Sequence, residues 1–417
     1  MSNFKNTRCM NCGSPRLARF IDLGDQPNGN HFPDEATKDA EIYFPFAMAV
    51  CEECWQVQLL EFPSPEFMFS SHPYITGVNK PVVEHFGRLS KRIVDRFRLR
   101  KHSLVIDIGC NDGTLLQCFS DLGMRVLGVD PGSITGALCR TRGINVCETF
   151  WNRETGRALK SLKLSPDVIT ATAVFYHVPD LHDFVLGLRE VMTERTVFMT
   201  QCIYLKDVIE KNQFDHFYHE HTMIHALRPL KRLLEGHGLR MLDVEFDPIH
   251  GGSFILYVGL AESVHATTKA VSDALLAEDS ARLDQMSTYT AFARRVERNR
   301  DALVALLRKL KGEGKTIYGL CAPLKGSTLL NYAGIGPDLV TLATEVNEHK
   351  IGKLIPGMHI PIVDERSLTK QPDYYLVLSW NFLDYFVQKY RGFLEAGGRF
   401  ISPNPEVRVI GEEALKG

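Results

Sequence analysis

The chain has 417 residues, which is too long for one ordinary core and favours two to four domains. Its 48 basic and 50 acidic residues give a formal charge of -2, so the overall field favours neither nucleic acid nor an anionic membrane. No stretch approaches the roughly 18 consecutive apolar residues of a membrane span, and the first residues lack the apolar core of a signal peptide. We expect a cytoplasmic monomer that acts on a small molecule, with no nucleic acid and no membrane as partner.

Two CxxC pairs open the chain, Cys9 with Cys12 and Cys51 with Cys54. In an intracellular protein, cysteines at this spacing are read as metal ligands before disulfides. Four thiolates complete a tetrahedral zinc and leave no open position for catalysis, so we expect a structural Zn²⁺ site. Residues 23–33, "LGDQPNGNHFP", are rich in turn formers and predict a loop-rich module. Two unrelated thiol pairs or a redox CxxC are the alternatives.

Residues 104–130, "LVIDIGCNDGTLLQCFSDLGMRVLGVD", predict a strand, a glycine turn, a helix and a second strand that ends in an acid. Gly109 and Gly113 bracket the turn, where the backbone can approach a ligand closely. Asp130 follows about 20 residues later, where an acid accepts hydrogen bonds from ribose hydroxyls. This βαβ unit predicts a nucleoside cofactor.

Polar side chains around that turn indicate which cofactor it binds. Asp107, Asn111 and Asp112 surround the glycines. Acidic groups so placed would repel a pyrophosphate lying on the following helix, whereas they suit a sulfonium and an amino acid. S-adenosylmethionine is therefore favoured over a dinucleotide, and a generic strand and turn is the remaining alternative.

Further strands and loops follow in the same pattern. Residues 167–172 predict a buried strand, after which a loop carries His177 and an amphipathic helix begins. Ligands of open α/β sheets lie beyond the carboxyl ends of the strands, so His177 is predicted to lie next to the reactive end of the cofactor. After one more strand, "FYHEHTMIHA" at 217–226 gathers three histidines with Tyr218 and Glu220.

The last third of the chain differs in composition from the part before it. Residues 264–311 are charged, rich in alanine and nearly free of glycine and proline, which predicts helices. Three apolar strands then follow, each with a polar or glycine-bearing loop after it, which predicts a second α/β domain.

Four motifs in order resemble those of the S-adenosylmethionine-dependent sugar C-methyltransferases, which methylate a nucleotide-linked 4-keto-hexose. They are the two CxxC pairs, "DIGCNDGTLL", "YHEH" at 218–221 and "CAPLKGSTLLNY" at 321–332. The resemblance covers almost the whole chain and implies an α/β fold with a small zinc module and two Rossmann-like domains. We expect a zinc-binding domain at 1–70, a methyltransferase domain at 71–263, a helical connection at 264–312 and a domain that binds the sugar nucleotide at 313–417.

The resemblance also implies site residues. Tyr218, Glu220, His221 and His177 match its active-site group, and Tyr74 matches a cofactor contact, although "YITGVNK" at 74–80 lacks serines of the family pattern. Cys321 stands where the family commonly has glycine.

Methylation of a sugar carbon requires a base that removes a proton and a group that stabilises the enolate. His221 suits the base because imidazole titrates near neutral pH, with Glu220 or Tyr218 orienting it or relaying the proton. His177 could donate a hydrogen bond to the 4-keto oxygen. By the resemblance, we expect methyl transfer to C3 with inversion. A second zinc site or a polar loop are the alternatives, but "HEH" lacks the i, i+4 spacing of helical zinc sites.

Four residues are candidate substrate contacts. Lys325 and Gly326 follow a strand where a helix begins, a place that suits a diphosphate, although a solvated lysine is the alternative. Asn347 follows a strand and could contact the nucleotide, whereas His250 before two glycines suits either a substrate contact or a turn. The alternative functions are an O-methyltransferase and a non-catalytic zinc protein that binds S-adenosylmethionine.

Overall fold

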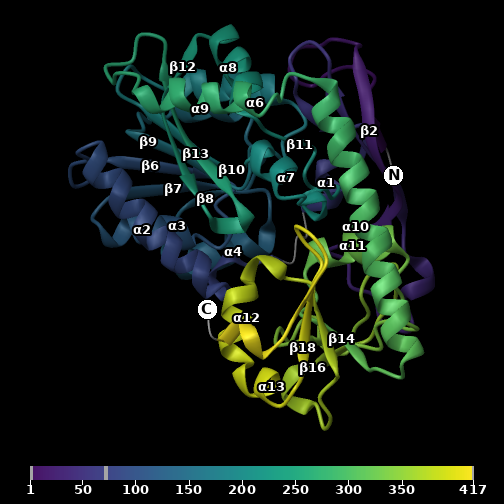
Figure 1. The fold of residues 1–417 in the computed structure, drawn as a ribbon. Helices are drawn as coiled ribbons and strands as arrows, with labels where there is room; N and C mark the ends of the chain where they lie inside the picture. The colour runs from purple at the N-terminus through teal and green to yellow at the C-terminus, as the bar shows by residue number, and fades with distance from the viewer. Residues whose placement is uncertain (1–2, 70–73, 416–417) are drawn as a thin grey trace.

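The computed structural model describes residues 3–69 and 74–415. Its strands form sheets of two, four, seven and six strands. Figure 1 shows the seven-stranded sheet in the upper part of the molecule, the six-stranded sheet below it, and the long helix α10 (Met286–Gly312) running down one side. Within the described ranges, no helix is long and apolar enough to cross a membrane.

The N-terminal module is more regular than its turn-rich sequence suggests. Its four-stranded antiparallel sheet has the order β11 (Met223–Ile224), β4 (Val57–Leu59), β3 (Tyr43–Cys51) and β2 (Leu17–Pro27). A two-stranded sheet of β1 (Asn3–Lys5) and β5 (Glu61–Pro63) and the short helix α1 (Pro65–Phe69) accompany it. The predicted loop is therefore wrong for residues 23–27, which belong to β2. A register shift between Asp22 and Asp25, with Gly24 at φ +72°, lets this turn-like stretch stay within the strand.

The βαβ prediction is confirmed in the seven-stranded sheet. Its strands, in spatial order, are β12 (Leu239–Asp247), β13 (Ser253–Leu260), β10 (Val197–Ile203), β9 (Val168–Thr172), β6 (Leu104–Ile108), β7 (Arg125–Val129) and β8 (Val146–Cys147). The helices that precede and connect them are α2 (Lys80–Arg96), α3 (Thr114–Asp121), α4 (Ser133–Thr141), α5 (Arg153–Ser161), α6 (Leu181–Val191), α7 (Leu205–Glu210) and α8 (Leu227–Gly236). From β6 the chain continues through β7 to β8 at one edge, and from β9 it crosses to β10 and then to β12 and β13 on the other side. Ligands bind at such a switch point, beyond the carboxyl ends of β6 and β9.

The predicted helical stretch consists of α9 (Lys269–Ser280) and α10. The six-stranded sheet then has the order β16 (Ile362–Asp364), β15 (Ala343–Glu345), β14 (Ile317–Leu320), β17 (Tyr374–Val377), β18 (Arg399–Ser402) and β19 (Arg408–Ile410). Its helices are α11 (Leu324–Ala333), α12 (Leu383–Lys389) and α13 (Arg391–Glu395). Its switch point lies between β14 and β17, so the mixed α/β fold with two Rossmann-like sheets is confirmed.

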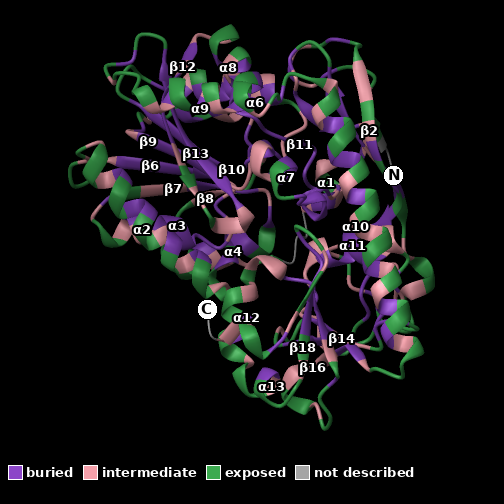
Figure 2. Cartoon of the chain, viewed as in Figure 1, coloured by how far each residue is buried: buried purple, intermediate pink, exposed green. Residues whose placement is uncertain are grey.

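Apolar side chains join the sheets into one body. One cluster of buried residues contains Met48 of β3, Phe198 of β10 and Leu376 of β17. Figure 2 shows the central strands buried and the outward helix faces exposed. Strand β10 is buried along its whole length, as expected for a strand covered on both faces. The three larger sheets therefore hold their loops in fixed relative positions.

Candidate functional site

The four predicted zinc ligands lie together. The thiol sulfurs of Cys9, Cys12, Cys51 and Cys54 are all within 4.8 Å of one another, with Cys9 and Cys54 3.5 Å apart and Cys12 and Cys51 3.6 Å apart. Among residues 3–69 and 74–415, this is the only group of three or more potential ligands that could hold a metal ion. Four thiolates fit a closed tetrahedral zinc site.

The turn after β6 is shaped to receive a cofactor. Gly109 has φ +67°, and a Cβ there would clash with the side chain of Val174, so the position requires glycine. Asp130, at the end of β7, is 8% exposed and accepts hydrogen bonds from the backbone N–H groups of Asn111 (2.8 Å) and Gly132 (2.9 Å). Thr135 Oγ1 also donates to Asp130 at 2.8 Å, and because a carboxylate has about four acceptor positions, Asp130 keeps one for a ribose hydroxyl.

The other residues predicted at this turn have structural partners. Burial raises the pKa of Asp107 to about 7, and its carboxyl accepts a hydrogen bond from Thr170 Oγ1 at 2.6 Å. The Asn111 side chain donates to the backbone oxygen of Tyr74 at 2.9 Å and accepts from the N–H of Thr76. Segment 74–77 is thereby attached to the turn. The backbone of Tyr74 therefore lies at the predicted cofactor site. The residue is 43% exposed.

The histidine at the end of "YHEH" has a defined tautomer. His221 is 1% exposed, and its Nδ1 lies 2.7 Å from the backbone oxygen of His216 in the 3-10 turn Phe214–His216. A carbonyl oxygen only accepts, so Nδ1 carries the proton and Nε2 carries the lone pair. Burial, followed by the nearby His177 and His216, holds the pKa of His221 well below its usual value. The imidazole is therefore neutral at pH 7, the form that can take a proton.

His177 and Tyr218 surround this imidazole. The ring centres of His177 and Tyr218 lie 5.1 Å and 3.7 Å from that of His221. His177 Nδ1 lies 2.6 Å from the backbone oxygen of Glu220, so this nitrogen also carries its proton. Burial raises the pKa of Tyr218 well above its usual value, so the phenol is neutral. The structure thus brings together two segments 43 residues apart, which the sequence pattern placed in one site.

His219 has a different environment. Its ring packs edge-on against Phe44 and Phe46, with centres 5.5 Å and 4.8 Å away, and burial lowers the pKa of His219 to about 4. His219 and His221 belong to no metal-binding group among the described residues. The alternative of a second zinc site therefore has no support in the described parts of the chain.

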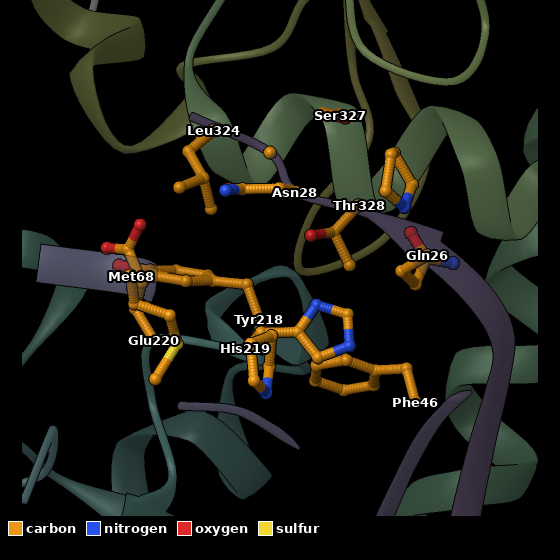
Figure 3. A pocket seen from close by; sticks show the side chains of 13 residues that line it. Gln26, Asn28, Phe46, Met68, Tyr218, His219, Glu220, Leu324, Ser327 and Thr328 are labelled. Atoms are coloured by element: carbon orange, nitrogen blue, oxygen red, sulfur yellow. The ribbon is translucent and has the colours of Figure 1, made fainter. Parts of the chain in front are cut away.

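A pocket lies where three parts of the chain meet. It is lined by Asn28 and Gly29 of the N-terminal module, Tyr218 and Glu220 of the "YHEH" segment, and Leu324 and Thr328 of α11. Figure 3 shows Asn28 and Leu324 on one side of it and Tyr218 and His219 on the other. The carboxyl group of Glu220, 8% exposed, accepts a hydrogen bond from the side-chain amide of Asn30 at 2.5 Å.

A polar network joins this region to the switch point of the six-stranded sheet. Asp215 is fully buried and accepts hydrogen bonds from Trp380 Nε1 at 2.6 Å and Asn404 Nδ2 at 3.0 Å. The Lys325 ammonium donates to Asn381 Oδ1 and lies 4.6 Å from the centre of the Trp380 ring. Burial lowers the pKa of Lys325 to about 8, although Asp215 opposes this shift.

The remaining predicted substrate contacts are spread around this network. The N–H of Gly326 donates to Pro323 O at 3.0 Å, and a Cβ there would lie 3.0 Å from Leu378 Cβ, so close packing accounts for the glycine. Asn347 Oδ1 caps its own turn by accepting from the His349 N–H. His250 has φ +59°, and burial lowers its pKa to about 4, with Lys325 adding to the effect. Lys325 therefore lies close enough to His250 to affect its pKa, whereas the Asn347 side chain is engaged in its own turn.

Three residues of this region were missed by sequence reasoning: Asn30, Asp215 and Trp380. Asn30 lies in a stretch that reads as a polar turn, and Asp215 and Trp380 meet across 165 residues. Of these three residues, only Asp215 has a local sequence signal for a place in the site, because it lies three residues before Tyr218.

Comparisons with known proteins match three successive parts of the chain. Family models match as a zinc binding domain over residues 9–69, a methyltransferase domain over 83–244 and a C-methyltransferase C-terminal domain over 248–405. The C-methyltransferase NovU of Streptomyces niveus is 33% identical over 408 residues, 97% of each chain. Similar solved structures include the magnesium protoporphyrin IX methyltransferase of Synechocystis, at 13% identity and a TM-score of 0.34 over 43% of this chain and 83% of that one. Another is an S-adenosylmethionine-dependent methyltransferase of Anabaena variabilis. It has 15% identity and a TM-score of 0.34, over 42% of this chain and 84% of that one.

Proposed function

The chain belongs to the S-adenosylmethionine-dependent C-methyltransferases, and we propose that it methylates C3 of a nucleotide-linked 4-keto-6-deoxyhexose in deoxysugar biosynthesis. The observation that carries this proposal is the buried, neutral His221, whose Nδ1 proton is committed to a carbonyl and whose Nε2 can act as a base. Carbon acids need such a base, whereas the sulfonium of the methyl donor needs none.

In the proposed reaction, His221 Nε2 takes the proton from C3 of the sugar. The electrons of the C3–H bond form the C3–C4 double bond, and the negative charge moves to the 4-keto oxygen. With this proton, His221 becomes an imidazolium, and its Nδ1–H still donates to the backbone oxygen of His216. General base catalysis of this kind contributes roughly 10²- to 10⁴-fold.

His177 is the proposed partner of the developing enolate oxygen. Because its Nδ1–H bonds the oxygen of Glu220, donation from Nε2 to the substrate requires the imidazolium form of His177. A donor placed at developing negative charge typically lowers the barrier by about 3 to 4 kcal/mol. Tyr218 and Glu220 would orient the two imidazoles or relay the proton.

The methyl donor would be held by the turn after β6. Asp130 would accept from the ribose hydroxyls, while Asp107, Asn111 and the close approach at Gly109 and Gly113 would shape the site. When bound, S-adenosylmethionine supplies the methyl group as an electrophile. The residues of this chain need only align C3 of the enolate with it.

The nucleotide part of the substrate would lie toward the six-stranded sheet. Lys325, in the first turn of α11 at the switch point, is the cation proposed for the diphosphate. His250 lies near this lysine and is a proposed substrate contact, whereas Gly326 would act through the close packing of the first turn of α11 and Asn347 through the shape of its loop. The zinc site would stabilise the N-terminal module and take no part in the chemistry.

A substrate panel tests this function. The protein is mixed with carbon-13 methyl-labelled S-adenosylmethionine and several 4-keto-6-deoxy sugar nucleotides, and the products are analysed by mass spectrometry and NMR. We expect one added labelled methyl group, with the carbon shift of a C–CH₃ group coupled to C3. A methyl shift typical of an ether would instead show an O-methyltransferase, and no transfer to any sugar nucleotide would overturn the substrate class.

A further inference from the structure

The catalytic segment is continuous with the sheet of the zinc module. Directly after His221, the Leu59 N–H donates to the oxygen of Thr222 at 2.9 Å, and β11 then pairs with β4. Met223 faces Gln58 and Ile224 faces Val57 in this pairing. Any shift of the module would therefore move the backbone that carries "YHEH".

A turn of the same module reaches the site from the other side. In residues 28–31, the His31 N–H donates to Asn28 O at 3.0 Å, and the Asn30 N–H donates to Asn28 Oδ1 at 3.2 Å. At Gly29, a Cβ would lie 3.0 Å from Leu324 Cγ, so the turn packs closely on α11. We call residues 28–31 the module turn.

The module turn is fixed to the C-terminal domain as well. The Leu354 N–H donates to Pro33 O at 2.8 Å, and the carboxylate of Glu41 accepts from the Gly357 N–H and from His359 Nε2. These contacts follow the turn in the chain, and strand β2 ends at Pro27 directly before it, so the turn is held on both sides. The position of Asn30 is therefore set by the fold and not by its own side chain.

We propose that Asn30 is a positioning residue of the active site, and that its side-chain amide holds the carboxylate of Glu220 in the orientation that the reaction uses. The proposal rests on the proposed function for its catalytic meaning. An ionised carboxylate only accepts hydrogen bonds, so the NH₂ group of Asn30 faces Glu220 Oε1. The zinc module then completes the active site as well as stabilising the fold.

An amide suits this role because it donates without carrying charge. A lysine or arginine at this position would add an ion pair with Glu220, whereas the amide of Asn30 donates a hydrogen bond to the carboxylate and adds no charge. Glu220 also presents its backbone oxygen to His177 Nδ1, so one residue links the module turn to both sides of the site.

The first test needs no substrate. Glutamate labelled with carbon-13 at the carboxyl carbon is incorporated, and the Glu220 signal is assigned as the one missing from Glu220→Gln. Loss of a donor disfavours the carboxylate, so Glu220 should titrate at higher pH in Asn30→Leu than in the parent, and higher still in Asn30→Asp, where two carboxyl groups face each other. Asn145→Asp, which adds the same charge at an exposed position, is the control. An unchanged titration in both Asn30 variants would overturn the proposal.

The second test measures catalysis. Asn30→Leu should lower kcat roughly tenfold or more, as expected for loss of a hydrogen bond to a charged group, and should move the acid limb of the pH profile in the same direction as the titration. Zinc content and affinity for S-adenosylhomocysteine should stay at parental values. A fall in kcat with an unmoved pH profile would mean a purely structural role and contradict the proposal. If the parent methylates no keto sugar, the proposed function fails, while the titration still decides the contact between Asn30 and Glu220.

Discussion

His221 Nδ1 lies 2.7 Å from the backbone oxygen of His216, and this single contact assigns opposite roles to the two nitrogens of the ring. The donating nitrogen is tied to the turn Phe214–His216, and the accepting nitrogen is the only one that can serve as a base. The same turn contains Asp215, which bonds Trp380 and Asn404 of the C-terminal domain. The orientation of the proposed base therefore depends on contacts between domains.

Removal of the buried Asp215 carboxylate should weaken the contacts between the domains and lower the stability of the protein. In Asp215→Ala, the Trp380 N–H and the Asn404 amide lose their acceptor inside the protein, at a cost of about 2 to 4 kcal/mol in the free energy of unfolding. Urea unfolding measures this loss. Asp301→Ala, at an exposed carboxylate on α10, is the control and should change stability by less than about 0.5 kcal/mol. Equal effects of the two substitutions would contradict the account of the network.

The buried histidines predict how stability changes with pH. Burial lowers the pKa of His219, His225 and His250 to about 4, below the value of about 6.5 expected in the unfolded chain. Between these values the unfolded chain binds more protons, so stability is full above pH 6.5 and falls as the pH drops toward 4. In His219→Leu, the loss on going from pH 7 to pH 5 should shrink by about 2 kcal/mol in total, because the slope of about 1.4 kcal/mol per pH unit applies only below pH 6.5. The same slope in parent and variant would show that His219 does not contribute.

Cofactor affinity should depend on Asp130. Asp130→Ala removes the proposed ribose acceptor and also the acceptor of two backbone N–H groups in the turn, so S-adenosylhomocysteine should bind about 10- to 100-fold more weakly by calorimetry. Asp121→Ala, at the exposed end of α3, should bind it as the parent does. Parental affinity in Asp130→Ala would show that this acid does not contact the cofactor.

The cysteine cluster predicts about one zinc per chain, because four thiolates complete one tetrahedral site. Elemental analysis of the purified protein measures it. Cys51→Ser should lower both the zinc content and the thermal midpoint, since metal binding contributes to folding. Cys147→Ser changes a half-buried thiol outside the cluster and should keep the full zinc content. Folded, reduced parent protein without zinc would contradict the assignment.

The family resemblance implied that His177 and the "YHEH" segment share one site, whereas local patterns were enough to predict the βαβ unit and the cysteine cluster. Each of these depends on short-range spacing or on the rule that loops after parallel strands share one edge of a sheet. The contact of Asn30 with Glu220 spans 190 residues, and β11 joins a sheet formed mainly by the first 60 residues. No periodicity or turn signal encodes such pairings, because they arise only when separately folded parts pack together.

The strand assigned to residues 23–27 shows a limit of turn propensity. Glycine, aspartate and proline predict a loop there, yet neighbouring β3 provides a hydrogen-bonding edge, and the bulge around Gly24 absorbs the irregularity. Tertiary pairing overrode the local preference. The loop begins at Asn28, where the module turn reaches the pocket.

His221 is the proposed base that removes the proton from C3 of a keto sugar. The most direct measurement is deuterium exchange at C3 in D₂O with the sugar nucleotide and S-adenosylhomocysteine, where the base can act although no methyl group is available. His221→Asn keeps a donor for the oxygen of His216 but lacks Nε2, so it should bind both ligands and lose exchange by roughly 10²-fold or more, together with methylation. Near-parental exchange in His221→Asn would contradict the assignment of His221 as the base.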